Sequence, residues 1–168
     1  MAGKSVVNLT MTRTFDVEPS KVFEAWVNPD LFRNWFMTLQ ATNKVAKNDL
    51  KVGGEWEIVD HRQGQDFRAI GTYQEIVDNE KLVFTFNMPQ FNDESDTLAV
   101  QLDKTETGTL MTFSHDITVL HEDNWTEEDI KKAEKEFHDS TEQGYTYMFM
   151  GLKELVETGK VSYKGEGH

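Results

Sequence analysis

Histidine is the side chain in this sequence best suited to acid–base or metal chemistry, and the chain has His61, His115, His121, His138 and His168. These residues show neither HExxH spacing nor a ligand pair at i and i+4 on one helix, so a metal site would have to be assembled from scattered strands. The chain has no cysteine, which removes thiolate ligands, disulfides and thiol nucleophiles. The sequence therefore predicts neither a metal nor a cofactor.

His115 is the histidine most suited to a ligand site, because alternation within its strand turns it inward beside Phe113 and Ile117. A buried imidazole either bonds a neighbouring side chain, which is the more common case, or meets the polar group of a ligand. Ser114 lies on the opposite side of the strand, so it cannot form a nucleophile–base pair with His115. The sequence offers no second catalytic group, and we predict no catalytic residue.

Two charged residues, Arg13 and Asp60, are placed by the same alternation on faces that carry the core. A buried charge needs a partner, so we expect a structural pair between them, with recognition of a ligand carboxylate as the alternative. Glu55 and Glu57 lie opposite Trp56 on their strand and should face solvent rather than form a catalytic pair.

The apolar pattern predicts an α+β fold. Alternation over residues 7–15 indicates an opening strand, and two short helices follow it, beginning near Pro19 and Pro29. Further strand-like runs with short connections indicate antiparallel hairpins, at residues 55–62, 67–77, 81–88, 97–103 and 109–119. A capping box at Thr126 begins a helix that can run to about Thr158.

The C-terminal helix should lie across the sheet on one stripe of side chains. The positions that recur every three or four residues are Ile130, Ala133, Phe137, Thr141, Gly144, Met148, Leu152 and Leu155. Glycine inside a helix costs up to about 1 kcal/mol relative to alanine. Gly144 and Gly151 therefore indicate either close contact between helix and sheet or room left for a ligand.

Several stretches together resemble a known family: TRTFDVEPSKVFEAWVNPDLFRNWF, DLKVGGEWEI, GTYQEIVDNEKLVFTF, GTLMTFSHDI and GYTYMFMGLKELVE. Over residues 8–157, the chain resembles the family named after the activator of heat-shock protein 90 ATPase, within the START-like (Bet v-like) superfamily. We expect residues 1–168 to form a single domain. The resemblance implies a helix-grip fold, in which a curved antiparallel sheet of six or seven strands surrounds the C-terminal helix. Tyr145, after Gly144, stands where the family usually has tryptophan.

A concave sheet and a single helix tend to leave a space wider than side chains fill, and we expect a ligand cavity there. Most of the aromatic residues, Tyr147 included, should belong to the core in any case, and a few should line the cavity. The predicted cavity-lining residues are Trp26, Trp35, Phe36, Trp56, Tyr73, Phe84, Phe86, Phe113, His115, Gly144 and Met148.

Three functions follow from this interpretation. The preferred one is a protein that binds a small hydrophobic molecule, with a lipid or an aromatic polyketide as the range that the superfamily suggests. The second is a co-chaperone that stimulates a heat-shock protein 90 type ATPase, which rests on the family resemblance alone. The third is a cavity enzyme with His115 as acid–base group, which lacks a second catalytic residue.

Composition limits the partners and the location. With 17 Lys and Arg against 30 Asp and Glu, the net charge of −13 should repel nucleic acid and anionic membrane surfaces. The N-terminus, MAGKSVVNLT, lacks the apolar core of a signal peptide, and no stretch approaches the ~18 apolar residues of a membrane span. We expect a soluble cytoplasmic protein without membrane insertion. The ligand and the oligomeric state are not specified by the sequence.

Overall fold

A computed structural model describes residues 3–38, 41–91 and 93–159 of the chain, so that His168 lies outside the described residues. Seven strands form one antiparallel sheet in the order β1-β7-β6-β5-β4-β3-β2. The strands are β1 (Lys4–Phe15), β2 (Asn43–Asn48), β3 (Glu55–Arg62), β4 (Gln65–Val77), β5 (Lys81–Phe86), β6 (Asp96–Lys104) and β7 (Thr109–Leu120). The helices are α1 (Pro19–Val27), α2 (Pro29–Phe32) and α3 (Glu127–Thr158). The predicted α+β helix-grip fold is confirmed, with seven strands.

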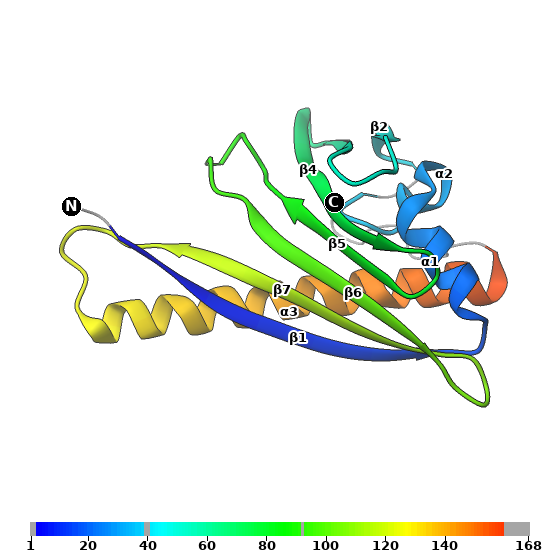
Figure 1. Cartoon of the computed structure of the whole chain (residues 1–168). Helices are drawn as coiled ribbons and strands as arrows, with labels where there is room; N and C mark the ends of the chain where they lie inside the picture. The colour runs from blue at the N-terminus through cyan, green and yellow to red at the C-terminus, as the bar shows by residue number, and fades with distance from the viewer. Residues whose placement is uncertain (1–2, 39–40, 92, 160–168) are drawn as a thin grey trace.

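Helix α3 runs along one face of the sheet (Figure 1). The apolar side chains of the strands are buried on that face. Along β5, β6 and β7 every second residue is buried, because successive side chains of a strand point to opposite faces. The antiparallel register places inner residues beside each other, as in the pairs Val100 with Phe113 and Phe84 with Leu98. Burial of each such side chain contributes about 1.5–3 kcal/mol.

Trp26 of α1 is the centre of the core. Its ring lies 4.6–6.4 Å, between centroids, from six other rings that belong to the segment 32–36, to β5, to β7 and to α3. These are the rings of Phe32, Trp35, Phe36, Phe84, Phe113 and Phe149. The Trp35 indole N–H donates to the Ala25 carbonyl at 3.0 Å, which holds the segment after α2 against α1. This aromatic cluster therefore joins both short helices, the sheet and α3.

The capping box at the start of α3 is confirmed. The Thr126 hydroxyl accepts from the Asp129 N–H, and the Asp129 carboxylate accepts from the Thr126 N–H. The helix ends at Gly159, whose φ of +90° is the left-handed conformation that glycine adopts without steric cost. Within the described residues, no helix is both long and apolar enough to cross a membrane.

The predicted stripe on α3 is confirmed at Ala133, Leu152 and Leu155 but is wrong in its middle part, where Phe137, Gly144 and Met148 were expected to face the sheet. The helix buries Ala133, Tyr145, Phe149, Gly151, Leu152 and Leu155. Phe137 is 48% exposed, and Gly144 and Met148 lie half-buried beside this face. The helix turns the large rings of Tyr145 and Phe149 inward, and these rings pack against Phe113 of the sheet, which the preceding residues, Gly144 and Met148, cannot do with an aromatic face. Tyr147, expected in the core, is exposed.

Two further expectations differ from the structure. The strand β2 was not predicted, because this edge strand pairs only with β3 and shows a polar sequence, NKVAKN. The pair between Arg13 and Asp60 is also wrong, because β1 and β3 lie far apart in the sheet order. Buried Asp60 accepts from the Thr38 hydroxyl and pairs with Arg62, whereas Arg13 lies over the Phe149 ring at 5.8 Å.

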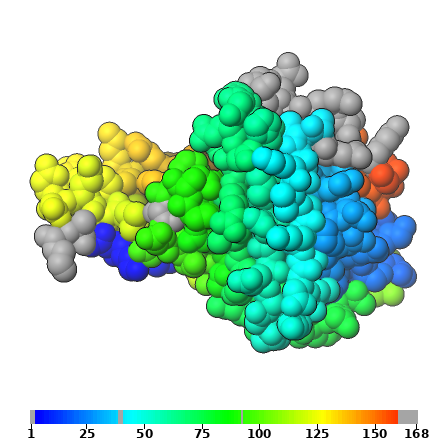
Figure 2. Space-filling model, turned by 90° about the horizontal axis from the view of Figure 1, so that it is seen from above, coloured from blue at the N-terminus to red at the C-terminus, as the bar shows by residue number. Residues whose placement is uncertain are grey.

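One end of the molecule extends beyond the rest, as Figures 1 and 2 show. It consists of the beginnings of β1 and α3, together with the end of β7. The Ser5 hydroxyl donates to the Glu134 carboxylate at 2.6 Å and lies 2.9 Å from the His121 Nε2. These contacts fasten the first turns of α3 to the first residues of the chain.

The sheet has an irregularity between β4 and β5, where the register shifts between Tyr73 and Glu75. The Trp56 side chain extends from β3 across β4 toward β5. Its indole N–H donates to the Thr85 carbonyl at 3.0 Å and takes the place of a hydrogen bond between the backbones of β4 and β5. A Cβ at Gly71 would lie 1.8 Å from that carbonyl oxygen and 2.6 Å from the Trp56 Nε1. Only glycine leaves space for this crossing.

We predict that Gly71→Ala lowers the free energy of unfolding by at least about 2 kcal/mol, since the added methyl must displace the indole or the β5 backbone. Gly144→Ala is the matched control, because a Cβ there meets no described atom within 4 Å outside its own helix. This second change should stabilise the protein by about 0.5–1 kcal/mol through helix propensity. Urea unfolding of both variants tests the pair, and equal effects would contradict the assigned role of Gly71.

Candidate functional site

A hollow of about 350 Å³ lies between the sheet and α3. Its walls come from the end of β5 and the segment after it, from the start of β6, from β7, from Met37 and from the middle of α3. Gly144 leaves the helix side open, because its missing side chain is not replaced by any neighbouring atom. Apolar side chains form most of the lining, which is typical of small-molecule sites.

The polar end of this hollow is a hydrogen-bonded chain of three side chains. The His115 Nδ1 lies 3.0 Å from the Tyr145 hydroxyl, and its Nε2 lies 2.8 Å from the Asp96 carboxylate. The second Asp96 oxygen accepts from the Thr118 N–H at 3.1 Å, which fixes the carboxylate. His115 and Tyr145 are buried, so this chain is shielded from competing water.

The sequence indicated no second catalytic group beside His115, whereas the structure brings two titratable side chains, Asp96 and Tyr145, into contact with it. Asp96 was missed because it lies at the first residue of β6, where alternation gives little information, and it reaches His115 from the neighbouring strand. Tyr145 was missed because the stripe on α3 was placed one residue too early. Its position after Gly144, where the resemblance expects an aromatic residue, was the available indication.

Burial raises the pKa of Tyr145 well above its ordinary value of 10.0, and the nearby negative charge of Asp96 raises it further. Both causes disfavour the phenolate. Tyr145 is therefore a neutral phenol at physiological pH, able to hydrogen-bond a ligand but not to act as a base.

The eleven residues predicted to line a cavity fall into three groups. Four lie along this hollow, namely Phe86, His115, Gly144 and Met148. Five belong to the aromatic cluster around α1, namely Trp26, Trp35, Phe36, Phe84 and Phe113. Trp56 and Tyr73 lie on the β2 side of this cluster, and the rings of both contact Phe84. Contact of any of these residues with a ligand remains a prediction.

The mouth of the hollow is apolar. Phe91 is 62% exposed and Phe137 is 48% exposed, and both border the hollow together with Met88 and Met148. Exposed aromatic side chains gathered at one opening mark a contact site more often than scattered ones do. The alternation over residues 81–88 placed Met88 on the inner face together with Phe86, whereas no pattern in the sequence indicated Phe91, which lies between β5 and β6.

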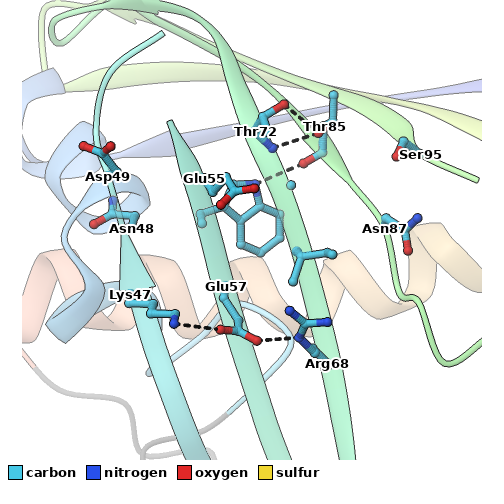
Figure 3. A pocket seen from close by; sticks show the side chains of 13 residues that line it. Lys47, Asn48, Asp49, Glu55, Glu57, Arg68, Thr72, Thr85, Asn87 and Ser95 are labelled. Atoms are coloured by element: carbon cyan, nitrogen blue, oxygen red, sulfur yellow. Dashed lines mark hydrogen bonds and ion pairs between the residues drawn. The ribbon is translucent and has the colours of Figure 1, made fainter. Parts of the chain in front are cut away.

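A second hollow, of about 630 Å³, lies on the outer face of the sheet (Figure 3). Glu57 projects there between Lys47, at 3.3 Å, and Arg68. The hydrogen bond from Arg68 lowers the pKa of Glu57 most, burial is the next largest effect and raises it, and the hydrogen bond from Lys47 lowers it further, so that the pKa is below its ordinary value. The outward positions of Glu55 and Glu57 are confirmed. These charges satisfy one another, so the outer hollow is the weaker candidate.

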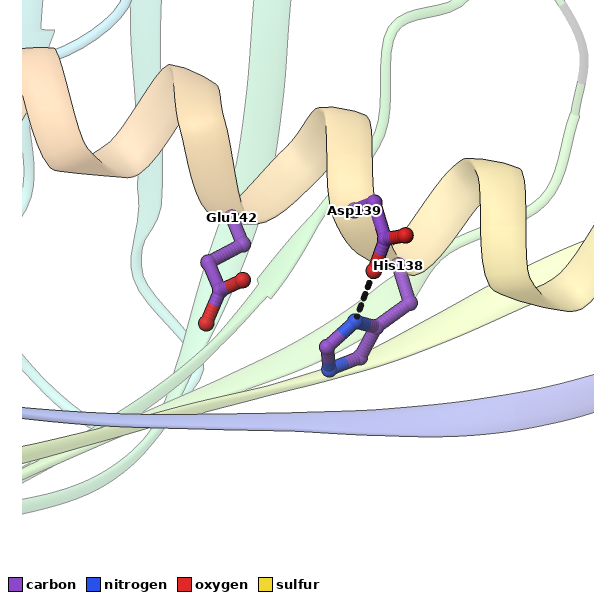
Figure 4. A group of neighbouring side chains, drawn as sticks. All are labelled: His138, Asp139 and Glu142. Carbon is purple, nitrogen blue, oxygen red and sulfur yellow. Dashed lines mark hydrogen bonds and ion pairs between the residues drawn. The ribbon is translucent and has the colours of Figure 1, made fainter.

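A third group, on α3, consists of His138, Asp139 and Glu142 (Figure 4). Their possible ligand atoms lie within 4.8 Å of one another. From the sequence we expect no pair of possible metal ligands at i and i+4 on one helix, whereas His138 and Glu142 of α3 stand at this spacing. Asp139 is engaged by Lys135, whose hydrogen bond lowers the carboxylate pKa, and by His138. These residues lie at the solvent-exposed surface and carry no argument for a bound ion.

The chain matches one protein-family model and is similar to several solved structures. Residues 16–157 match the model of a family described as activator of Hsp90 ATPase homolog 1-like protein. A Staphylococcus aureus protein of unknown function has 32% identity and a TM-score of 0.88, with coverage of 93% of this chain and 96% of that one. An uncharacterised Rhizobium leguminosarum protein has 18% identity and a TM-score of 0.74, with coverage of 94% and 98%, and shows the fold alone. Among curated proteins, none matches this sequence.

We predict that Tyr145→Phe lowers the free energy of unfolding at neutral pH by about 1–2 kcal/mol, because the buried His115 Nδ1 loses its partner. The raised pKa adds a pH dependence with a definite sign. Stability from the neutral phenol is complete below pH 10.0, the ordinary phenol value, and is lost as pH rises toward the folded-state pKa.

The wild-type protein should therefore lose stability more steeply above that pH than the Tyr145→Phe variant does. Urea unfolding of both proteins over an alkaline pH series measures the difference. Parallel curves would show that the Tyr145 hydroxyl is not held in its neutral form by the fold.

Proposed function

The chain belongs to the family of activator of Hsp90 ATPase homolog 1-like proteins, and from this premise we propose that it binds a small apolar molecule in the hollow beside Gly144. The observation that carries the proposal is an open, mainly apolar space that ends in the buried chain of Tyr145, His115 and Asp96. An apolar wall gives affinity, and a few fixed polar groups give orientation.

The size of the hollow suits a ligand of modest affinity. A molecule that buries about 300 Å² of apolar area gains roughly 7 kcal/mol, and loss of free motion removes at least about 4 kcal/mol. Apolar burial alone therefore leaves at most about 3 kcal/mol, which corresponds to a millimolar affinity, and tighter binding requires hydrogen bonds at the polar end of the hollow. We propose that this binding takes place in the cytoplasm and within a single domain. We assign no reaction, because the neutral Tyr145 phenol suits ligand recognition better than base catalysis.

We predict that Gly144→Trp abolishes binding of an apolar fluorescent probe while the fold persists. The indole would enter the hollow, because no described atom occupies the space around a Cβ at this position outside the helix. Fluorescence titration measures binding, and thermal melting measures stability.

Met150→Trp is the matched control, since Met150 lies on the same helix but is 63% exposed and does not line the hollow. This control should bind the probe as the wild type does. Probe binding that survives Gly144→Trp, or a large fall in melting temperature for that variant alone, would contradict the proposed site.

The second candidate is a co-chaperone that stimulates an Hsp90-type ATPase, and membership of a family described as activator of Hsp90 ATPase homolog 1-like protein favours it. We predict that the purified protein increases the ATPase rate of the Hsp90 homologue from the same host if this function is present. An unchanged rate at saturating protein, measured beside a positive control, would remove this candidate and leave the ligand-binding proposal intact.

A further inference from the structure

We propose that the hollow beside Gly144 selects apolar molecules whose polar end donates hydrogen bonds and carries no negative charge, with hydrophobic amines as the preferred class. This inference rests on the proposed binding function and adds the charge of the ligand to it. It follows from the polar atoms that line the hollow, from their hydrogen-bond partners and from the rings around them.

The charged residues that border the hollow are acidic. Glu94 and Asp96 are both among its lining residues, and none of the described lining residues is lysine or arginine. Glu94 pairs at 3.0 Å with exposed Lys4, and Asp96 bonds His115. A ligand carboxylate would therefore meet two carboxylates of the protein without a guanidinium or ammonium group from the lining to receive it.

The neutral polar groups also present acceptors. With a neutral imidazole, His115 donates through Nε2 to Asp96, so its Nδ1 is bare and accepts the Tyr145 hydroxyl proton. The Tyr145 oxygen then has only lone pairs left for a ligand. Asn87 borders this hollow but also lines the outer one (Figure 3), and its amide offers donors as well as an acceptor.

The remaining polar side chains do not oppose this preference. The hydroxyl groups of Thr118 and Thr141 can donate or accept, so they fit an amine, an alcohol or a carboxylate and do not discriminate among them. Phe86, Phe91 and Phe137 also line the hollow, and aromatic faces attract an ammonium group. An amine can thus satisfy the acceptors at the polar end, whereas an acid cannot.

The test uses one apolar body with three polar ends: naphthylethylamine, naphthylethanol and naphthylacetate. Isothermal titration calorimetry at neutral pH compares their affinities for the wild-type protein, and Gly144→Trp gives the background of binding outside the hollow. We expect the amine to bind at least about 10-fold more tightly than the acid, with the alcohol between them.

Two substitutions in β6 distinguish the effect of a carboxylate that lines the hollow from the effect of the protein's net charge. Asp96→Asn should reduce the preference for the amine over the acid by about 10-fold, whereas Asp103→Asn, an equal change of charge at an exposed position, should change it less than about 2-fold. Glu94→Gln offers a second variant that leaves the His115 contacts in place, and melting curves establish that each variant is folded.

The outcomes distinguish the inference from the function beneath it. An acid that binds as tightly as the amine, and is excluded by Gly144→Trp, would overturn the charge preference while the binding site stands. Equal effects of Asp96→Asn and Asp103→Asn would also overturn it, since the preference would then reflect the overall acidity. Failure of all three compounds to bind above background would overturn both proposals.

Discussion

The packing of rings around Trp26 is the interaction on which the other features depend. It connects α1, the segment after α2, the inner face of the sheet and α3, so the orientation of the long helix follows from it. The Trp26 indole N–H is buried without a hydrogen-bond partner among the described residues, which costs about 1–3 kcal/mol. That cost is acceptable because large aromatic side chains bury 150–250 Å² each, by typical values.

This arrangement also explains why a space remains along α3. The rings of Phe149 and Tyr145 fill the gap between helix and sheet on the side of the cluster, and Phe149 contacts Trp26 and Phe113. One residue before Tyr145, Gly144 supplies no side chain, and His115 of β7 borders the space that is left. The hydrogen bonds of His115 then place polar atoms at the edge of an otherwise apolar interior. The core and the candidate site are therefore two parts of one helix–sheet contact.

Much of the fold could be predicted from the sequence, because burial imposes a period of two on strands and of three to four on helices. The inner faces of β5, β6 and β7 and the capping box at Thr126 follow from these rules. Edge strand β2 did not, since its polar side chains show no buried face. The site was harder to predict. The expected stripe on α3 was one residue too early in its middle part, so Gly144 was expected to face the sheet where Tyr145 does. The contact between His115 and Asp96 joins two neighbouring strands. Such contacts depend on register, which local patterns do not determine.

The pairing of β1 with β7 has a consequence for synthesis on the ribosome. The two strands are joined along their whole length, from Lys4 with Leu120 to Phe15 with Thr109, so β1 has no partner in the sheet until β7 has left the exit tunnel. At roughly 5–20 residues per second, translation of the intervening chain takes on the order of 5–20 s. During that interval the inward side chains of β1, Leu9 and Met11 among them, are exposed in an unpaired segment. We therefore expect chaperones that bind apolar segments at the ribosomal exit tunnel to bind the β1 segment of the nascent chain.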